Sequence, residues 1–179
     1  LFYQTINRLI KIKRGEVMFT AGVLTASDKG AKGERADESG KLIALELEKL
    51  GYNVVEKIVV QDEIDEITSA LEEMVDRGIN LILTTGGTGF SKRDVTPEAT
   101  KMVIERETPG ISEAIRHFSF QITKKAMLSR AVSGIKKDSL IINMPGSPKA
   151  VKESMDIIMP SIEHGLEILL GLTGECARK

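Results

Sequence analysis

The hydrophobic pattern of this chain alternates between two periods. Short apolar runs cover 18–26, 53–60 and 80–85, and each is followed by polar residues or glycine. Between them, over 43–50 and 64–75, apolar residues recur every three or four positions. Short continuous apolar runs are typical of buried strands, and the wider spacing is typical of amphipathic helices. The order strand, helix, strand, helix, strand predicts an α/β fold, in which helices cover both faces of a mostly parallel sheet.

The second half of the chain has a less regular pattern. It predicts helices over 97–107 and 110–120 and strands over 129–134 and 139–144. The four residues between the last two strands allow either a hairpin or a short crossover, so the strand direction stays open. Because proline removes a backbone donor and clashes with the preceding helical turn, we expect Pro160 to divide the final helical pattern into two helices.

Length and composition limit the class of protein. The 179 residues predict a single domain with a substantial core, which we assign to 18–179. Residues 1–17 differ in composition and lack a signal-peptide layout, so we expect a non-native upstream extension or an arm that packs on a neighbouring subunit. The formal net charge of −1 argues against a nucleic-acid binder. No apolar run approaches the ~20 residues that a membrane span requires.

The cysteine and histidine residues suggest neither a disulfide nor a metal site. A single cysteine, Cys176, has no disulfide partner within the sequence and fits a reducing compartment, so we expect a cytoplasmic protein. His117 and His164 lie far apart on helical patterns and suggest no zinc-type cluster.

The most informative segment for chemistry is 83–98, where an apolar run ends in a glycine cluster. Gly86, Gly87 and Gly89 let the backbone approach a ligand closely, and a tight turn is the alternative. Two cations and a carboxylate follow, namely Lys92, Arg93 and Asp94. Backbone N–H groups and cations suit a phosphate, while the aspartate suits either a divalent metal or plain solvent. Thr96-Pro97-Glu98 predicts a helix start with Thr96 as its N-cap.

Three other polar loops follow predicted strands. They are Ser27-Asp28, Gln61-Asp62-Glu63 and Pro145-Gly146-Ser147-Pro148. Ligands of open α/β sheets bind beyond the carboxyl ends of the strands, so we expect these loops to meet the glycine segment. Each also allows a structural role: Asp62 suits the N-cap of the next helix, and the other two loops suit an Asx turn and a capped turn. Ser129-Arg130 fits either an ordinary strand start or an anion contact.

Standard nucleotide and hydrolase motifs are missing from the sequence. It contains no GxxxxGK[ST] P-loop, no GxGxxG after the first strand and no nucleophile elbow. An ordinary P-loop enzyme, a dinucleotide-binding enzyme and a Ser-His-Asp hydrolase are therefore disfavoured.

The ordered set of motifs resembles the molybdopterin-binding domain of molybdenum cofactor biosynthesis, the MogA/MoaB family that also includes the G domain of gephyrin. The matching segments, in family order between residues 18 and 170, are 25–28, 60–63, 84–89, 93–98, 109–110, 129–130 and 143–149. The glycine cluster alone would be a weak match, whereas the complete ordered set is specific.

The resemblance implies a fold and a reaction. The fold is a doubly wound three-layer α/β sandwich that assembles as a homotrimer or homohexamer. The reaction is the transfer of AMP from ATP to the phosphate of molybdopterin, a dithiolene pterin, with Mg²⁺ as cofactor and pyrophosphate as the second product. The metal-insertion protein of the next step is an expected partner, and nucleic acid and membrane are not.

The resemblance also implies the site residues. Asp62 and Asp94 match two aspartates that are important in the active branch, and we expect them to be catalytic and to hold Mg²⁺. The expected substrate-binding residues are Ser27, Asp28, Gly86, Gly87, Thr88, Gly89, Lys92, Arg93, Ser129, Arg130, Pro145, Gly146 and Ser147. Which cation meets which phosphate stays open.

Two other functions stay open at this point. A MoaB-type protein would bind molybdopterin, or act as a scaffold, without transferring AMP, and the Met-Pro-Gly-Ser run over 144–147 is MoaB-like. A pyrophosphatase-like relative of the same fold would hydrolyse a nucleotide without any pterin. The intact Arg93-Asp94-Val95-Thr96-Pro97 segment favours the transferase.

Overall fold

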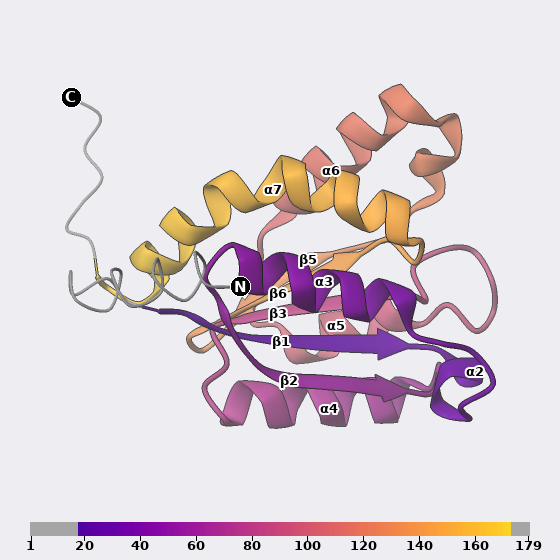
Figure 1. The fold of residues 1–179 in the computed structure, drawn as a ribbon, viewed down its shortest axis with the longest axis horizontal. Coiled ribbons are helices and arrows are strands. Elements are labelled where there is room, and N and C mark those ends of the chain that lie inside the picture. The colour runs from indigo at the N-terminus through magenta and orange to yellow at the C-terminus, as the bar shows by residue number, and fades with distance from the viewer. Residues whose placement is uncertain (1–17, 173–179) are drawn as a thin grey trace.

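The computed structural model describes residues 18–172, which form one six-stranded sheet with helices on both faces (Figure 1). The strands lie in the order β2-β1-β3-β6-β5-β4. Their bounds are β1 Thr20–Ala26, β2 Asn53–Val60, β3 Leu81–Thr85, β4 Arg106–Glu107, β5 Ser133–Lys136 and β6 Ser139–Met144. Every residue of β3 and β6 is buried, as expected for central strands covered on both sides.

The helices form the two outer layers. Their bounds are α2 Asp28–Ala31, α3 Glu38–Lys49, α4 Ile64–Asp76, α5 Thr96–Val103, α6 Pro109–Ile122, the 3-10 helix η1 Lys124–Leu128 and α7 Pro148–Leu169. One face of the sheet packs against α3, α6 and α7, and the other packs against α4 and α5 (Figure 1). The apolar stripes of α3 and α4 are fully buried at Ile43, Leu47, Ile67 and Leu71. The predicted three-layer α/β sandwich is therefore confirmed.

Strand direction determines where the loops meet. β1 is parallel to β2 and β3, and β3 is parallel to β6. The carboxyl ends of these four strands therefore lie along one edge of the sheet. The loops that follow them, which begin at residues 27, 61, 86 and 145, all leave from that edge. This is the edge where open α/β sheets bind ligands.

The region after α5 differs from the prediction. The helix expected over 97–107 ends at Val103, and Arg106–Glu107 instead forms the short edge strand β4, antiparallel to β5. Backbone bonds from Glu105 N to Ile135 O (2.8 Å) and from Thr108 N to Ser133 O (2.8 Å) draw this segment onto the sheet. Tertiary pairing thus overrides local helix propensity here.

The last two predicted strands form a hairpin. β5 and β6 are antiparallel, and the turn between them places Lys137 at a φ of 51°. β5 begins only at Ser133, so the expected strand start at Ser129 was wrong by four residues. Residues 129–132 instead run past the end of the glycine segment, which brings Arg130 to the candidate site.

Pro160 does not divide the last helix, contrary to the prediction. α7 continues through it from Pro148 to Leu169. Pro160 is exposed, as is Asp156, whose carbonyl loses its usual helical partner. That carbonyl lies on the solvent side, while Ile158 and Ile162 hold the helix against the core on both sides of the proline.

Two predictions fall outside the described residues. They concern the segment 1–17 and Cys176. Within 18–172, no helix is both long enough and apolar enough to cross a membrane.

A buried polar network joins the central sheet to α5. The side chain of Asn143 on β6 donates to Thr84 Oγ1 (3.0 Å) and to Thr100 Oγ1 (2.8 Å). Its Oδ1 accepts from Val132 N (3.1 Å). All three side chains are fully buried, so each lost bond would leave an unsatisfied polar group in the core.

Replacing Asn143 should therefore be costly. We expect Asn143→Leu to lower the free energy of unfolding by about 3 kcal/mol, because two hydroxyls and one N–H lose their partner. Urea unfolding measures the change. Asn53→Leu is the control, because its side chain bonds to no residue of 18–172, and equal losses in the two variants would contradict the network's role.

Candidate active site

The glycine loop, residues 86–89, begins with a close approach between two strand ends. Gly86 has a φ of 91°, and a Cβ at this position would lie 2.3 Å from Ala26 O, the last carbonyl of β1. Gly87 also has a positive φ, of 62°. On the other side, a Cβ at Gly146 would lie 3.6 Å from Gly86 Cα. The loops after β1, β3 and β6 therefore meet at Gly86, where only glycine fits against β1.

The backbone N–H groups of the glycine loop point to no internal acceptor. None of residues 86–89 donates a backbone hydrogen bond within 18–172, although Gly87 O accepts from Thr96 N (3.1 Å) and Thr88 O accepts from Arg130 N (2.9 Å). The carbonyls of Gly87 and Thr88 thus have hydrogen-bond partners, while the N–H groups of residues 86–89 have none within 18–172. Such an arrangement suits an anionic ligand.

Asp62 does not cap α4, so the capping interpretation was wrong. The N-cap of α4 is Glu63, and no side chain caps this helix. Asp62 Oδ2 instead accepts from Asp28 N (2.9 Å), and Asp28 Oδ1 accepts from Asp62 N (3.1 Å). This reciprocal pair holds the loops after β1 and β2 together.

The other oxygen of Asp62 is directed toward the glycine loop. A Cβ at Gly87 would lie 3.3 Å from Asp62 Oδ1, which accepts no hydrogen bond within 18–172. Burial raises the pKa of the Asp62 carboxyl, and the charges of Asp28 and Asp94 raise it further, against the hydrogen bond from Asp28 N. The nearby charge of Arg93 lowers this pKa in part, and a bound cation would lower it further.

Asp94 approaches the same loop at Gly89. Its Oδ2 accepts from Ser91 N (2.9 Å), and a Cβ at Gly89 would lie 2.9 Å from this oxygen. Asp62 and Asp94, from loops 32 positions apart in the sequence, thus both approach the glycine loop. Their catalytic and metal roles stay predictions.

Arg93 ties the Asp94 loop, residues 90–95, to neighbouring elements. Its Nε and Nη2 donate to the two carboxylate oxygens of Asp28 (3.1 and 2.8 Å), and its Nη1 donates to Glu63 (2.7 Å). These bonds hold the pKa of Asp28 below its ordinary value and raise the pKa of Arg93. Arg93 is thus engaged by carboxylates in the structure.

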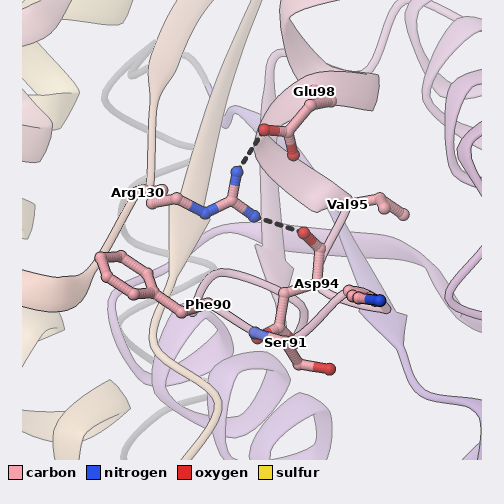
Figure 2. A pocket seen from close by; sticks show the side chains of 7 residues that line it. Phe90, Ser91, Asp94, Val95, Glu98 and Arg130 are labelled. Carbon is pink, nitrogen blue, oxygen red and sulfur yellow. Dashed lines mark hydrogen bonds and ion pairs between the residues drawn. The ribbon is translucent and has the colours of Figure 1, made fainter.

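Arg130 bonds to residues before, within and after the Asp94 loop (Figure 2). Its Nε donates to Gly89 O (2.7 Å), and its two terminal nitrogens bond to Asp94 O and to the Glu98 carboxylate. Ser129 Oγ accepts from Ala131 N (3.4 Å), which is a local turn contact. Both residues hold protein atoms here, and their predicted contact with an anion is untested.

An open pocket of about 530 Å³ lies beside the glycine loop. It is lined by Phe90, Ser91, Lys92, Asp94, Val95, Glu98 and Arg130 (Figure 2). Phe90 leaves 70% of its surface exposed, and Lys92 forms no hydrogen bond or ion pair within 18–172. The pocket therefore offers one aromatic face and one uncommitted cation.

The remaining predicted residues take structural positions at the same edge. Ser27 caps α2 through Gly30 N (3.1 Å), and Ser147 caps α7 through Ala150 N (3.3 Å). Pro145 O accepts from Thr85 Oγ1 (2.6 Å), and Gly146 O accepts from Ser39 Oγ (2.9 Å). These residues have structural partners and still lie next to the glycine loop.

Thr96 does not have the predicted role. Val95 is the N-cap of α5, without a side-chain cap, and Thr96 is the first residue of the helix. Its side chain is fully buried, and its Oγ1 has no hydrogen-bond partner within 18–172. Sequence reasoning did not assign Thr96, Phe90 or Glu98 to the site: it interpreted Thr96 and Glu98 as a helix start, and only the fold shows what surrounds each side chain.

The carboxylates present fit a magnesium ion that is shared with a substrate. Within 18–172, no three His, Cys, Asp or Glu side chains are grouped as a ready-made metal site. Mg²⁺ commonly uses one or two carboxylates together with substrate phosphates and water, so such a group is not required. Asp62 and Asp94 each keep one carboxylate oxygen free of hydrogen bonds from the described residues, and they offer two suitable ligands.

The fold and the site define a class. The protein is a three-layer α/β sandwich with a glycine loop of unpaired N–H groups, within 18–172, and two carboxylates at the carboxyl edge of its sheet. The family model described as "Probable molybdopterin binding domain" matches residues 22–164. The chain belongs to this family, which confirms the resemblance to MogA and MoaB proteins.

Individual relatives agree with the family assignment. The molybdopterin adenylyltransferase of Helicobacter pylori strain J99 is 42% identical over 153 residues, which are 84% of this chain and 87% of that protein. The gephyrin of Dictyostelium discoideum is 40% identical over 164 residues, and the match covers 86% of this chain but 23% of gephyrin. The crystal structure of the molybdopterin biosynthesis enzyme MoaB from Thermus thermophilus has a TM-score of 0.80 and 43% identity, over 86% of this chain and 98% of that chain.

Adding one methyl group at Gly86 tests how closely this residue approaches β1. We expect Gly86→Ala to lower the free energy of unfolding by at least about 3 kcal/mol, because the methyl group would meet Ala26 O at a positive φ. Thermal or urea unfolding measures the effect. Gly78→Ala is the control, since its φ is also positive, at 72°, but nothing lies within 4 Å of the added atom. Similar losses would show that backbone conformation, and not the contact with β1, fixes Gly86.

Proposed function

We propose that this protein is a molybdopterin adenylyltransferase. It transfers AMP from ATP to the terminal phosphate of molybdopterin and releases pyrophosphate. The observation that carries the proposal is the glycine loop, whose four N–H groups have no acceptor within 18–172 and which Asp62 approaches at Gly87 and Asp94 at Gly89. The identity to curated molybdopterin adenylyltransferases, 42% over 84% of this chain for the Helicobacter pylori protein, supports it.

The reaction requires positioning more than a protein nucleophile. A phosphate oxygen of molybdopterin attacks the α-phosphorus of ATP, the new P–O bond forms, and the bond to the pyrophosphate leaving group breaks. Negative charge collects around the α-phosphorus during this exchange. Fixed backbone donors stabilise such charge without reorganisation, which is the role that we assign to residues 86–89.

Asp62 and Asp94 are the residues that would hold Mg²⁺. A bound Mg²⁺ would neutralise phosphate charge and favour departure of pyrophosphate. The protein's own part is to keep the two carboxylates in place: Asp28 N fixes Asp62, and Ser91 N fixes Asp94. Because both approach the glycine loop, they could share a cation with a phosphate bound there.

The reaction product tests the function directly. Purified protein incubated with molybdopterin, ATP and Mg²⁺ should convert the pterin to a species heavier by one adenylyl group, with pyrophosphate release, as measured by mass spectrometry. Molybdopterin binding without a mass change would favour the MoaB-type carrier. ATP hydrolysis in the absence of molybdopterin would favour a pyrophosphatase.

Asp94→Asn should abolish most of the transfer. The substitution removes one negative charge and almost no volume, so the rate constant should fall by at least about 100-fold while molybdopterin still binds. A fixed-time assay of adenylylated product measures turnover, and pterin fluorescence measures molybdopterin binding. Asp76→Asn is the control, because Asp76 lies at the end of α4 and pairs with Lys137, away from the site. Unchanged turnover of Asp94→Asn would reject its metal role.

Lys92 is the cation that we assign to the triphosphate of ATP. Arg93 is engaged by Asp28 and Glu63, and Arg130 is engaged by Gly89, Asp94 and Glu98, whereas Lys92 is unpaired within 18–172 and lines the pocket. Moving either arginine to a phosphate would break contacts that hold the Asp94 loop. A lysine is also a flexible point charge that can follow a phosphate.

Lys92→Met should raise the KM for ATP by about tenfold and change kcat much less, because a charge-assisted contact to phosphate is lost in both ground and transition states. Steady-state kinetics separate the two parameters. Lys101→Met is the control, because Lys101 is exposed on α5 and does not line the pocket. An unaltered KM for ATP would contradict the assignment of Lys92.

The assembly and setting stay proposals as well. We propose a homotrimer or homohexamer in the cytoplasm that delivers its product to a metal-insertion protein. The family membership supports this arrangement. Light scattering of the purified protein measures the oligomeric state.

A further inference from the structure

The aromatic ring of Phe90 lines the open pocket beside the glycine loop (Figure 2). It leaves 70% of its surface exposed, and no other large apolar side chain of 18–172 is more exposed. Within the same residues, no aromatic ring pairs with it and no cation lies over it. The ring therefore adds little to the core, and it offers a flat apolar surface on which another ring can stack.

Glu98 brings a carboxylate to the same pocket (Figure 2). Its Oε1 accepts from Arg130 Nη1, while its Oε2 accepts no hydrogen bond within 18–172. The side chain is 47% exposed, so the second oxygen is accessible to a ligand. Arg130 is itself held by Gly89 O (2.7 Å), and it therefore fixes which of the two carboxylate oxygens stays available. The pocket thus offers one hydrogen-bond acceptor of defined identity.

Three features of the pocket together describe one kind of ligand. Phe90 offers a stacking surface, Glu98 offers an acceptor, and Lys92 offers a cation that is unpaired within 18–172. A flat heterocycle that carries an exocyclic amino group and is joined to a phosphate fits this set. Adenine and the pterin ring both have such an amino group. Because Lys92 is assigned to the triphosphate of ATP, the base joined to that triphosphate is the ring that the pocket favours.

We propose that this pocket binds the adenine base of ATP, with the ring stacked on Phe90 and the 6-amino group donating to Glu98 Oε2. The inference rests on the proposed function, since it places the nucleotide whose triphosphate meets Lys92. Adenine carries a donor at position 6 of the purine ring, whereas hypoxanthine and guanine carry an acceptor oxygen there. A carboxylate attracts the amino group and repels the oxygen. Glu98 is therefore the residue that selects adenine over a 6-oxopurine.

The affinities for ATP and for ITP, whose base is hypoxanthine, measure this selection. Calorimetric titration of the full chain should give a Kd for ITP that is weaker than the Kd for ATP by about tenfold, because the site is half exposed and water competes for the carboxylate. The expected difference is smaller than in a closed site, where an unpaired polar group has a larger cost.

Glu98→Gln should remove or reverse the preference. Arg130 Nη1 is a donor and holds the amide oxygen at the position of Oε1, so the amide NH₂ replaces Oε2. The variant should therefore bind ITP at least as tightly as ATP. Glu105→Gln is the matched control, because Glu105 also pairs with a cation, Lys136, but does not line the pocket. It should keep the wild-type ratio of the two Kd values.

Phe90→Ala tests the stacking surface separately. Both Kd values should weaken by about tenfold, as is typical when an aromatic partner of a base is removed, and their ratio should stay the same. The melting temperature should stay close to that of the wild type, because the ring is mostly exposed. Phe118→Ala is the matched control, since Phe118 is also exposed but does not line the pocket. It should keep both affinities.

Three results would overturn the inference. They are equal affinity of the wild type for ATP and ITP, an unchanged ratio in Glu98→Gln, and weaker binding of molybdopterin with unchanged binding of ATP in Phe90→Ala, which would assign the pocket to the pterin. The reaction product distinguishes these failures from failure of the proposed function. Adenylylated product together with any of the three leaves the transferase intact. The expected selection of adenine without any adenylylated product retains the nucleotide pocket and rejects the transferase.

Discussion

The site depends on the close approach of Gly86 to the last carbonyl of β1. Parallel neighbouring strands already bring their carboxyl ends to one edge, but side chains normally keep the following loops apart. Here the missing side chain at Gly86 lets the exit of β3 touch β1, and the exit of β6 lies beside Gly86 at Gly146. The glycine loop is therefore enclosed by backbone from its neighbours. Only then can Asp62 and Asp94, from different loops, border the same four residues.

A second constraint is that the three cations near the glycine loop have different partners. Arg93 and Arg130 are both bound by protein oxygens around the Asp94 loop, whereas Lys92 stays free within the described residues. The loop is thus held in shape before any substrate arrives. Preorganised donors are effective in catalysis because they need no rearrangement when charge develops. This difference in partners is why the adjacent cations Lys92 and Arg93 are assigned different roles.

Strong periodicity made most of the fold predictable. The strand 53–60 and the helix that starts at Ile64 coincide with the observed elements, because each pattern had a clear turn or stop residue beside it. β4 could not be predicted, since its two exposed residues, Arg106 and Glu107, become a strand only by pairing with β5. Pro160 was misjudged for a similar reason: burial of its neighbours and solvent at its free carbonyl keep α7 continuous.

The candidate site was less accessible to sequence reasoning. The loops were expected at one edge because that follows from strand direction alone. The partner of Asp62 is a backbone N–H 34 positions away, so no local pattern distinguishes it from a helix cap. Thr96 looked like an ordinary cap for the same reason, and only its contact with Gly87 reveals a free hydroxyl.

The ion pairs of Arg93 and Arg130 make the shape of the site depend on salt concentration. The Arg93 pairs with Asp28 and Glu63, and the Arg130 pair with Glu98, are partly exposed to solvent. Exposed ion pairs weaken as dissolved salt screens them over a Debye length of about 8 Å at physiological strength. The backbone bond from Arg130 to Gly89 is not an ion pair and is much less affected. In a halophilic cytoplasm, the Arg93 contacts would therefore loosen before those of Arg130, and a chain adapted to brine would need an apolar contact there.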